Sequence, residues 1–198
     1  ALWSAVRHIE GNDLEGDVVE CGVWRGGSSM LIALTLQDLN DRERSLWLYD
    51  TFAGMSSPTD RDLDPMGRNM AEEWTRHDGQ VDDPVFAYSS LEEVRANMSS
   101  TGFPASRTRY VRGKVEETIP GEVPDRIALL RLDTDWYEST RHELEHLWPR
   151  LVPGGVLIID DYGHWAGSRQ AVDEFFGAMR DAPLISRIDD SGRIAVKR

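Results

Sequence analysis

The 198-residue chain predicts an α/β fold, with one doubly wound, mostly parallel sheet that contains a reversed strand near the C-terminus. Short apolar runs alternate with segments of helical spacing along most of the chain. A glycine-rich turn follows the first apolar run, as at the start of a βαβ unit. The last two runs are joined by Asp189-Asp190-Ser191-Gly192, which is typical of a tight hairpin and therefore predicts an antiparallel strand.

The first βαβ unit is read from three consecutive segments. Residues 17–22 form a β-like run that ends at Gly22, and residues 25–39 have the apolar spacing of a helix. Residues 45–50 predict a second strand, which ends at Asp50.

Residues 51–89 interrupt this alternation. They contain prolines, many aspartates and scattered aromatic residues, with only a weak helical pattern at 67–77. A long insertion inside a compact domain is usually a functional loop. We therefore expect a single domain over residues 1–198, with a lid insertion at about 51–89.

The alternation resumes after the insertion. Ser90 and Glu93 form a capping pattern at the start of a predicted helix, 90–100. The remaining segments bring the predicted strands to seven: strands 107–112, 126–132, 155–160, 183–188 and 192–197, and helices 138–151 and 167–180.

Composition narrows the function class. The net charge of −13 repels phosphate backbones, so nucleic acid is not expected as a substrate. No apolar run reaches the roughly 18 residues of a membrane span, and no signal peptide is recognised. The single cysteine, Cys21, lies in an apolar run, which indicates a buried structural thiol and a reducing, cytoplasmic environment.

Acidic residues stand at four predicted strand ends, namely Glu20, Asp50, Asp133 and the pair Asp160-Asp161. Ligands bind at the carboxyl ends of the strands in this type of sheet. One such carboxylate means little, because strand ends are solvated. Four on one edge of the sheet indicate a functional site.

The turn after the first strand reads Gly22-Val23-Trp24-Arg25-Gly26-Gly27 and lacks the Gly-x-Gly-x-x-Gly spacing of dinucleotide sites. The preceding Glu20 would repel a pyrophosphate but suits an amino group or a sulfonium. Asp50 is placed to bind a ribose diol, in nicotinamide and S-adenosylmethionine sites alike. Alternatively, Asp50 caps the loop that follows it.

Crowded carboxylates after the strands 126–132 and 155–160 predict a metal site. Asp133 and Asp160 become neighbours if these strands pair, and like charges repel unless a cation lies among them. Oxygen ligands favour Mg²⁺, or Mn²⁺ or Ca²⁺, over zinc. The alternative is that Asp135 and Asp161 only cap helices.

Together these residues resemble the macrocin O-methyltransferase family, sugar and phenol methyltransferases of antibiotic biosynthesis. The resemblance covers nearly the whole chain in the right order and lies in five stretches: residues 19–28, 49–55, 111–120, 131–140 and 154–162. It implies a Rossmann-like class I methyltransferase fold that binds S-adenosyl-L-methionine and one divalent metal ion.

The resemblance also implies roles for individual residues. Glu20 and Ser28 match positions at the methionine end of the cofactor, Asp50 matches its ribose ligand, and Gly22 is a further cofactor-binding position. The remaining matches are Gly113, Lys114 and Val115 beside the adenine, and Asp133, Asp160 and Asp161 as metal ligands, with Asp133 also bordering the cofactor.

The general base is not settled by the resemblance. Catechol O-methyltransferase, which has a similar arrangement, uses a Lys three residues after its first Asp ligand, where this chain has Trp136. Asp135 is the nearest candidate and Asp133 is another. His142 and His164 are weaker candidates, because a lone His is more often structural.

We therefore expect a magnesium-dependent O-methyltransferase in which the metal binds a small-molecule hydroxyl acceptor, a sugar or a phenol, and lowers its pKa. Two alternatives stay open at this point: a nicotinamide-dependent oxidoreductase and a non-catalytic S-adenosylmethionine-binding module. We expect no membrane partner, and a homo-oligomer is compatible with the sequence.

Overall fold

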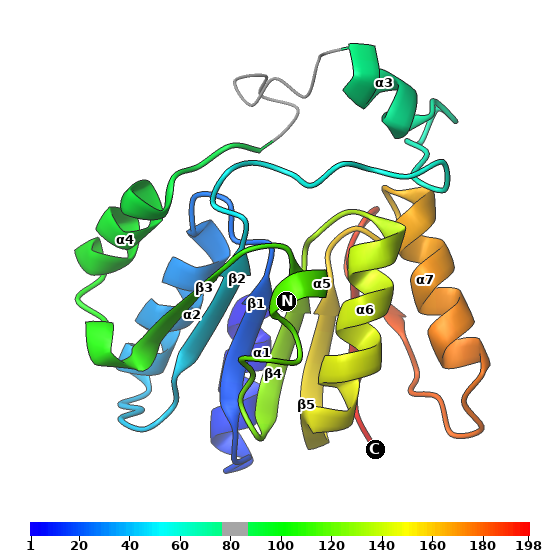
Figure 1. The fold of residues 1–198 in the computed structure, drawn as a ribbon. Coiled ribbons are helices and arrows are strands. Elements are labelled where there is room, and N and C mark those ends of the chain that lie inside the picture. The colour runs from blue at the N-terminus through cyan, green and yellow to red at the C-terminus, as the bar shows by residue number, and fades with distance from the viewer. Residues whose placement is uncertain (77–86) are drawn as a thin grey trace.

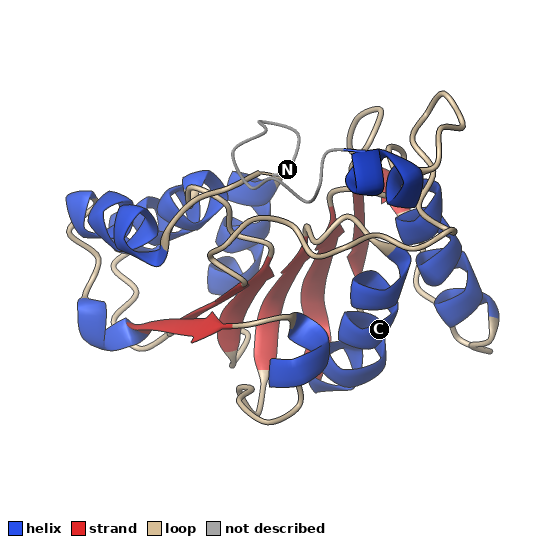
Figure 2. Cartoon of the chain, turned by 45° about the horizontal axis from the view of Figure 1, so that its top comes forward, coloured by secondary structure: helices blue, strands red, loops and turns tan. Residues whose placement is uncertain are grey.

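The computed structural model describes residues 1–76 and 87–198, which form a three-layer α/β sandwich (Figures 1 and 2). Its seven-stranded sheet has the order β3-β2-β1-β4-β5-β7-β6, and only β7 runs antiparallel to its neighbours. The predicted fold class is confirmed. The strands are β1 Asp17–Cys21, β2 Leu46–Asp50, β3 Thr108–Arg112, β4 Ile127–Leu132, β5 Leu151–Ile159, β6 Ser186–Arg187 and β7 Arg193–Val196.

Helices cover both faces of the sheet. Those on one face are α1, α2 and α4, and those on the other are α5, α6 and α7 (Figure 1). Short 3₁₀ segments at Ala105–Arg107 and Trp148–Arg150 precede β3 and β5. The helices are α1 Leu2–Gly11, α2 Gly27–Asp38, α3 Met70–Arg76, α4 Leu91–Ser100, α5 Val115–Thr118, α6 Tyr137–Leu147 and α7 Ala166–Gly177.

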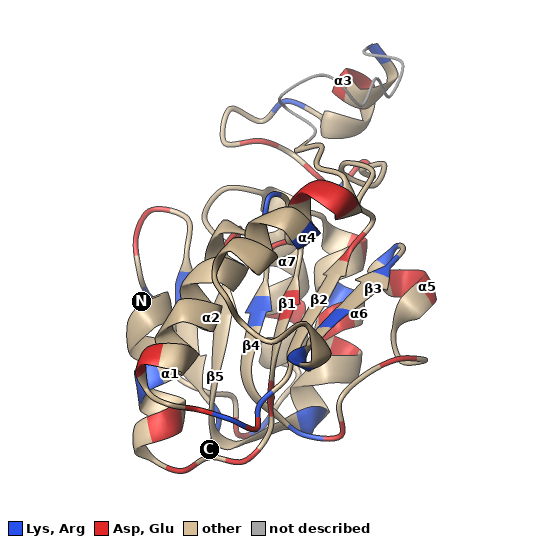
Figure 3. Ribbon diagram, turned by 90° about the vertical axis from the view of Figure 1, so that its left-hand side faces the viewer, with Lys and Arg blue, Asp and Glu red and all other residues tan. Residues whose placement is uncertain are grey.

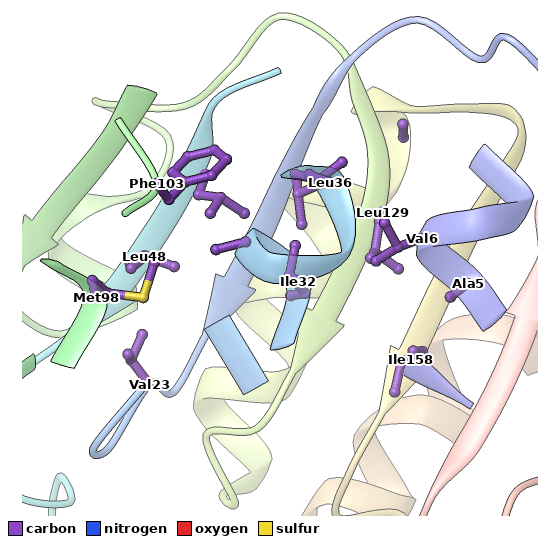
Figure 4. Packing of buried hydrophobic residues seen from close by; sticks show 14 of the residues in the cluster. Ala5, Val6, Val23, Ile32, Leu36, Leu48, Met98, Phe103, Leu129 and Ile158 are labelled. Atoms are coloured by element: carbon purple, nitrogen blue, oxygen red, sulfur yellow. The ribbon is translucent and has the colours of Figure 1, made fainter. Parts of the chain in front are cut away.

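Two apolar cores result, one on each face of the sheet. In the first, Val6 of α1 and Ile32 of α2 pack against the sheet beside Leu48 and Leu129 (Figure 4). All six residues of β4 are buried, as expected for a central parallel strand that is covered on both sides. This burial places the carboxyl ends of β1, β2, β4 and β5 at one fixed edge of the sheet.

Most predicted boundaries agree with the structure within a few residues. Ser90 caps α4 by accepting a hydrogen bond from the Glu93 N–H, as the sequence predicts. The strand expected at 183–188 is reduced to Ser186–Arg187, because β6 is an edge strand that pairs only with β7. The helices α1 and α5 are additions to the predicted elements, and α5 spans only four residues.

The insertion crosses the carboxyl edge of the sheet from β2 towards α7 and α3 (cyan in Figure 1). Its anchor is the fully buried Asp62, which accepts hydrogen bonds from the Thr59 N–H at 2.7 Å and from the Tyr137 N–H at the start of α6 at 2.8 Å. The predicted helix at 67–77 corresponds to α3. Residues 77–86 of the predicted lid lie outside the described residues.

None of the described helices combines the length and the apolar character that crossing a bilayer requires.

Candidate active site

A cavity of about 350 Å³ opens at the carboxyl edge of the sheet, between the strand ends and the start of the insertion. The insertion contributes Gly54, Met55 and Ser56 to its wall. Most residues that the sequence predicted for the site line this cavity: Gly22, Asp50, Gly113, Lys114, Val115, Asp133, Asp135, Asp160 and Asp161.

Gly22 brings the end of β1 against the end of β4. It has a φ of +81°, and a Cβ at this position would lie 1.9 Å from the Asp133 carbonyl oxygen. The Asp133 N–H donates to the Cys21 carbonyl at 2.8 Å. Only glycine allows this approach, so the turn and Asp133, the first of the predicted metal ligands, are positioned together.

Asp50 organises the glycine-rich turn. Its Oδ2 accepts from the Val23 N–H at 2.7 Å and from the Trp24 N–H at 3.0 Å, and its Oδ1 accepts from the Phe52 N–H at 2.7 Å. Asp50 therefore caps the loop, as one reading of the sequence predicts. It also lines the cavity, and its role as a ribose ligand stays a prediction.

The segment predicted to lie beside the adenine forms the next part of the wall. The Gly113 N–H donates to the Asp50 carbonyl at 3.0 Å, which ties the end of β3 to the end of β2. Gly113 has a φ of +140° and turns the chain into α5, whose N-terminal cap is Lys114. Val115 follows as its first residue and is buried.

Glu20 and Ser28 do not line the cavity. Glu20 is 1% exposed and accepts hydrogen bonds from the Ser29 hydroxyl and from Arg131. Ser28 lies in the first turn of α2 and is half-buried. Sequence reasoning therefore missed Ser29, which holds Glu20 in the layer beneath the cavity.

Asp133, Asp160 and Asp161 come together as predicted. Each offers a carboxylate oxygen, and these oxygens lie within 4.8 Å of one another. Burial raises the pKa of Asp133 and of Asp161 well above the ordinary value, and repulsion between the carboxylates adds to the shift. This donor set suits a hard divalent cation, whose charge would offset both effects.

An internal cation, Arg131, lies beneath these carboxylates. Its guanidinium donates to Glu20 at 2.9 Å, to Asp133 at 2.6 Å and to Asp160 at 2.8 Å. The residue is only 7% exposed. The signal in the sequence is an arginine among the apolar residues of 127–132.

Asp135 is held in a left-handed conformation, with a φ of +71°. Its Oδ1 accepts from the Trp165 ring N–H at 2.6 Å, and its backbone N–H donates to Asp161 at 3.1 Å. Burial, followed by repulsion from Asp133, raises the pKa of Asp135.

Trp136 stands where the catechol enzyme has its lysine, and here its role is packing. The residue is 2% exposed, and its ring stacks at a tilt against Trp165 with centroids 5.0 Å apart. Its ring N–H donates to the Ser56 carbonyl at 2.8 Å, which attaches the insertion to the carboxylate loop.

A second feature that sequence reasoning missed is Glu143 on α6, which is completely buried. One of its oxygens accepts from the Thr134 hydroxyl at 2.9 Å, and the other has no hydrogen-bond partner among the described residues. Burial raises the pKa of Glu143 well above the ordinary value. The neighbouring Cys21 is a buried free thiol, as predicted, and burial also raises its pKa.

The two histidine candidates lie outside the cavity lining. The His142 Nε2 lies 2.8 Å from the Ile119 carbonyl oxygen, and its ring stacks on His146. His164 packs edge-on against Trp165. These contacts agree with structural roles.

Comparison with known proteins identifies the family. Residues 1–195 match the sequence model of the family described as "Macrocin-O-methyltransferase (TylF)". The chain belongs to this family. It is therefore an S-adenosylmethionine-dependent O-methyltransferase, and the predicted resemblance is confirmed. The family assignment leaves the nicotinamide alternative without support.

Two characterised proteins are similar to the chain over most of its length. The 8-demethyl-8-(2,3-dimethoxy-alpha-L-rhamnosyl)-tetracenomycin-C 4'-O-methyltransferase of Streptomyces olivaceus is 39% identical over 96% of this chain and 69% of its own length. The mycinamicin III 3''-O-methyltransferase of Micromonospora griseorubida is 37% identical over 89% of this chain and 66% of its own length. The chain thus spans about two thirds of these relatives.

Solved structures agree with this assignment. The O-methyltransferase NovP superposes with a TM-score of 0.84 at 31% identity, over 99% of this chain and 77% of NovP. The calicheamicin methyltransferase CalS11 superposes with a TM-score of 0.69 at 22% identity, over 98% of this chain and 76% of CalS11, and supports the fold alone.

Proposed function

We propose that this O-methyltransferase requires a divalent metal ion, Mg²⁺ by preference, and methylates a hydroxyl group of a natural-product sugar. The observation that carries the metal requirement is the convergence of Asp133, Asp160 and Asp161, with carboxylate oxygens within 4.8 Å of one another in a cavity wall. The sugar is favoured over a phenol by the rhamnosyl group in the name of the Streptomyces relative.

The three aspartates would hold the metal ion, and all of their offered atoms are oxygens. A divalent cation supplies Lewis-acid stabilisation of the negative charge that develops on an acceptor oxygen. S-adenosylmethionine supplies the methyl group as an electrophilic sulfonium. Asp50 holds the turn beside the proposed ribose position, and residues 113–115 form the wall proposed for the adenine.

Asp135 is the proposed general base, with Asp133 as the second candidate. The Trp165 ring N–H donates to one oxygen of Asp135, and the Asp135 carboxyl also shares a side-chain hydrogen bond with Asp161. A raised pKa makes a carboxylate a better proton acceptor near neutral pH. Asp135 would therefore take the acceptor's hydroxyl proton.

The insertion is the proposed lid. Gly54, Met55 and Ser56 already border the cavity, and the contacts of Trp136 with Ser56 and of Asp62 with Tyr137 hold the insertion on the sheet. Covering the acceptor in this way would exclude water from the transferring methyl group.

The proposal is tested by methyl transfer to a panel of glycosylated and phenolic acceptors, followed by mass spectrometry. We expect transfer to glycosides to stop with EDTA and to return with added Mg²⁺. Undiminished transfer in EDTA would refute the metal requirement, and a preference for phenols would refute the sugar acceptor. The cytoplasmic location, the exclusion of nucleic acid and the homo-oligomeric state stay predictions.

A further inference from the structure

Burial of the Arg131 guanidinium carries an unfavourable desolvation free energy. It lies in β4, where the other five residues are apolar and buried, and its side chain is 9% exposed. Removing a guanidinium from water costs several kcal/mol in general, and apolar replacements of buried ion pairs are often neutral or stabilising. Stability alone therefore does not explain Arg131.

The position of Arg131 in β4 explains why its side chain contacts the carboxylates of Glu20, Asp133 and Asp160. It precedes Asp133 by two residues, so both side chains leave the same face of β4. Its register partner in β1 is Glu20, and its register partner in β5 is Ile158, two residues before Asp160. Figure 3 shows that acidic and basic residues lie on the neighbouring strands β1 and β4 inside the sheet.

The contacts of Arg131 leave part of each aspartate free. Arg131 bonds Oδ2 of Asp133 and Oδ1 of Asp160, and no described residue donates to the other oxygen of either carboxylate. Glu20 accepts a hydrogen bond from the guanidinium on one oxygen and from the Ser29 hydroxyl on the other. The fork of the arginine thus fixes the rotation of two carboxylates while leaving one oxygen of each available.

We infer that Arg131 is a positioning residue, which holds Asp133 and Asp160 in the orientation that binds the divalent cation. The inference rests on the proposed metal site. Lysine cannot replace this function, because an ammonium on a flexible stem is a point charge and lacks the planar fork that spans several carboxylates.

The test compares Arg131→Lys with the wild type by Mn²⁺ titration, followed by electron paramagnetic resonance. The matched control is Arg107→Lys, since Arg107 is also largely buried and paired with Asp41 away from the cavity. We expect at least about tenfold weaker Mn²⁺ binding in Arg131→Lys, the loss typical of an outer-shell partner, and wild-type binding in the control.

A second variant covers the case in which Arg131→Lys does not fold. Glu20→Gln keeps the size of the side chain but removes the negative charge that pairs with the guanidinium, so Mn²⁺ binding should again weaken by more than threefold. A purely structural role would lower Tm in both variants and leave Mn²⁺ affinity within twofold of the wild type, which would overturn the inference alone. Absence of Mn²⁺ binding by the wild type would overturn the proposed metal site and the role of Arg131 together.

Discussion

The carboxylates in the cavity differ in their hydrogen-bond donors between the cofactor end, at Asp50, and the cation end, at Asp133 and Asp160. At one end, Asp50 accepts three backbone N–H groups and so fixes the turn around it. At the other end, Asp133 and Asp160 share one guanidinium, and the pKa of Asp133 is raised by burial. A carboxylate with enough donors organises backbone, whereas carboxylates with too few donors favour binding of a cation.

Gly22→Ala should disturb the turn at the cofactor end and Asp133 at the cation end together, and should have the largest effect of the variants on the protein. A Cβ would lie 1.9 Å from the Asp133 carbonyl at a backbone φ of +81°. We expect a loss of at least about 3 kcal/mol in the free energy of unfolding, measured by urea denaturation. Gly27→Ala is the control, because its Cβ would meet nothing within 4 Å. Equal stability of the two variants would contradict the close approach.

Asp160→Asn should damage only the cation end. The variant loses one negative oxygen of the proposed metal site, so methyl transfer should fall about 100- to 1000-fold. Binding of S-adenosylhomocysteine, measured by calorimetry, should stay within about threefold of the wild type. Asp173→Asn on α7 is the control, since Asp173 bonds Tyr162 outside the cavity. Activity near wild type in Asp160→Asn would disprove the assignment.

Asp50→Asn should damage only the cofactor end. The Asn amide has only one acceptor oxygen, so it cannot accept both from the Phe52 N–H and from the N–H groups of Val23 and Trp24, and each unpaired donor costs about 1–3 kcal/mol. We expect S-adenosylhomocysteine to bind about 10- to 100-fold more weakly. Mn²⁺ affinity should be unchanged, and a parallel loss of Mn²⁺ binding would show that the two ends are not independent.

Glu143→Gln should have the smallest effect, seen in the pH dependence of stability. Because burial raises the pKa of Glu143, its contribution to stability is fully present below its ordinary pKa of about 4.3 and is lost as the pH rises towards the folded-state value. The glutamine variant should match the wild type near pH 4 and exceed its Tm by about 2–4 °C at pH 8. A Tm difference that does not change with pH would contradict this origin.

Much of the site could be read from the sequence because it follows the strand ends. Asp50, Asp133, Asp160 and Asp161 were predicted from their places after apolar runs, and all of them line the cavity. Arg131 and Glu143 could not be assigned in this way. Their partners are distant in sequence or on another element, so only the packed structure reveals what they contact.

The sequence by itself determined the doubly wound fold, the edge that carries the site and the acidic character of that edge, because strand periodicity and loop position are local properties. The tertiary structure decided how the charges are paired. It pairs Arg131 with two aspartates of the proposed metal site and makes Trp136 a packing residue. Pairing depends on strand register and burial, which arise only when β1, β4 and β5 lie side by side.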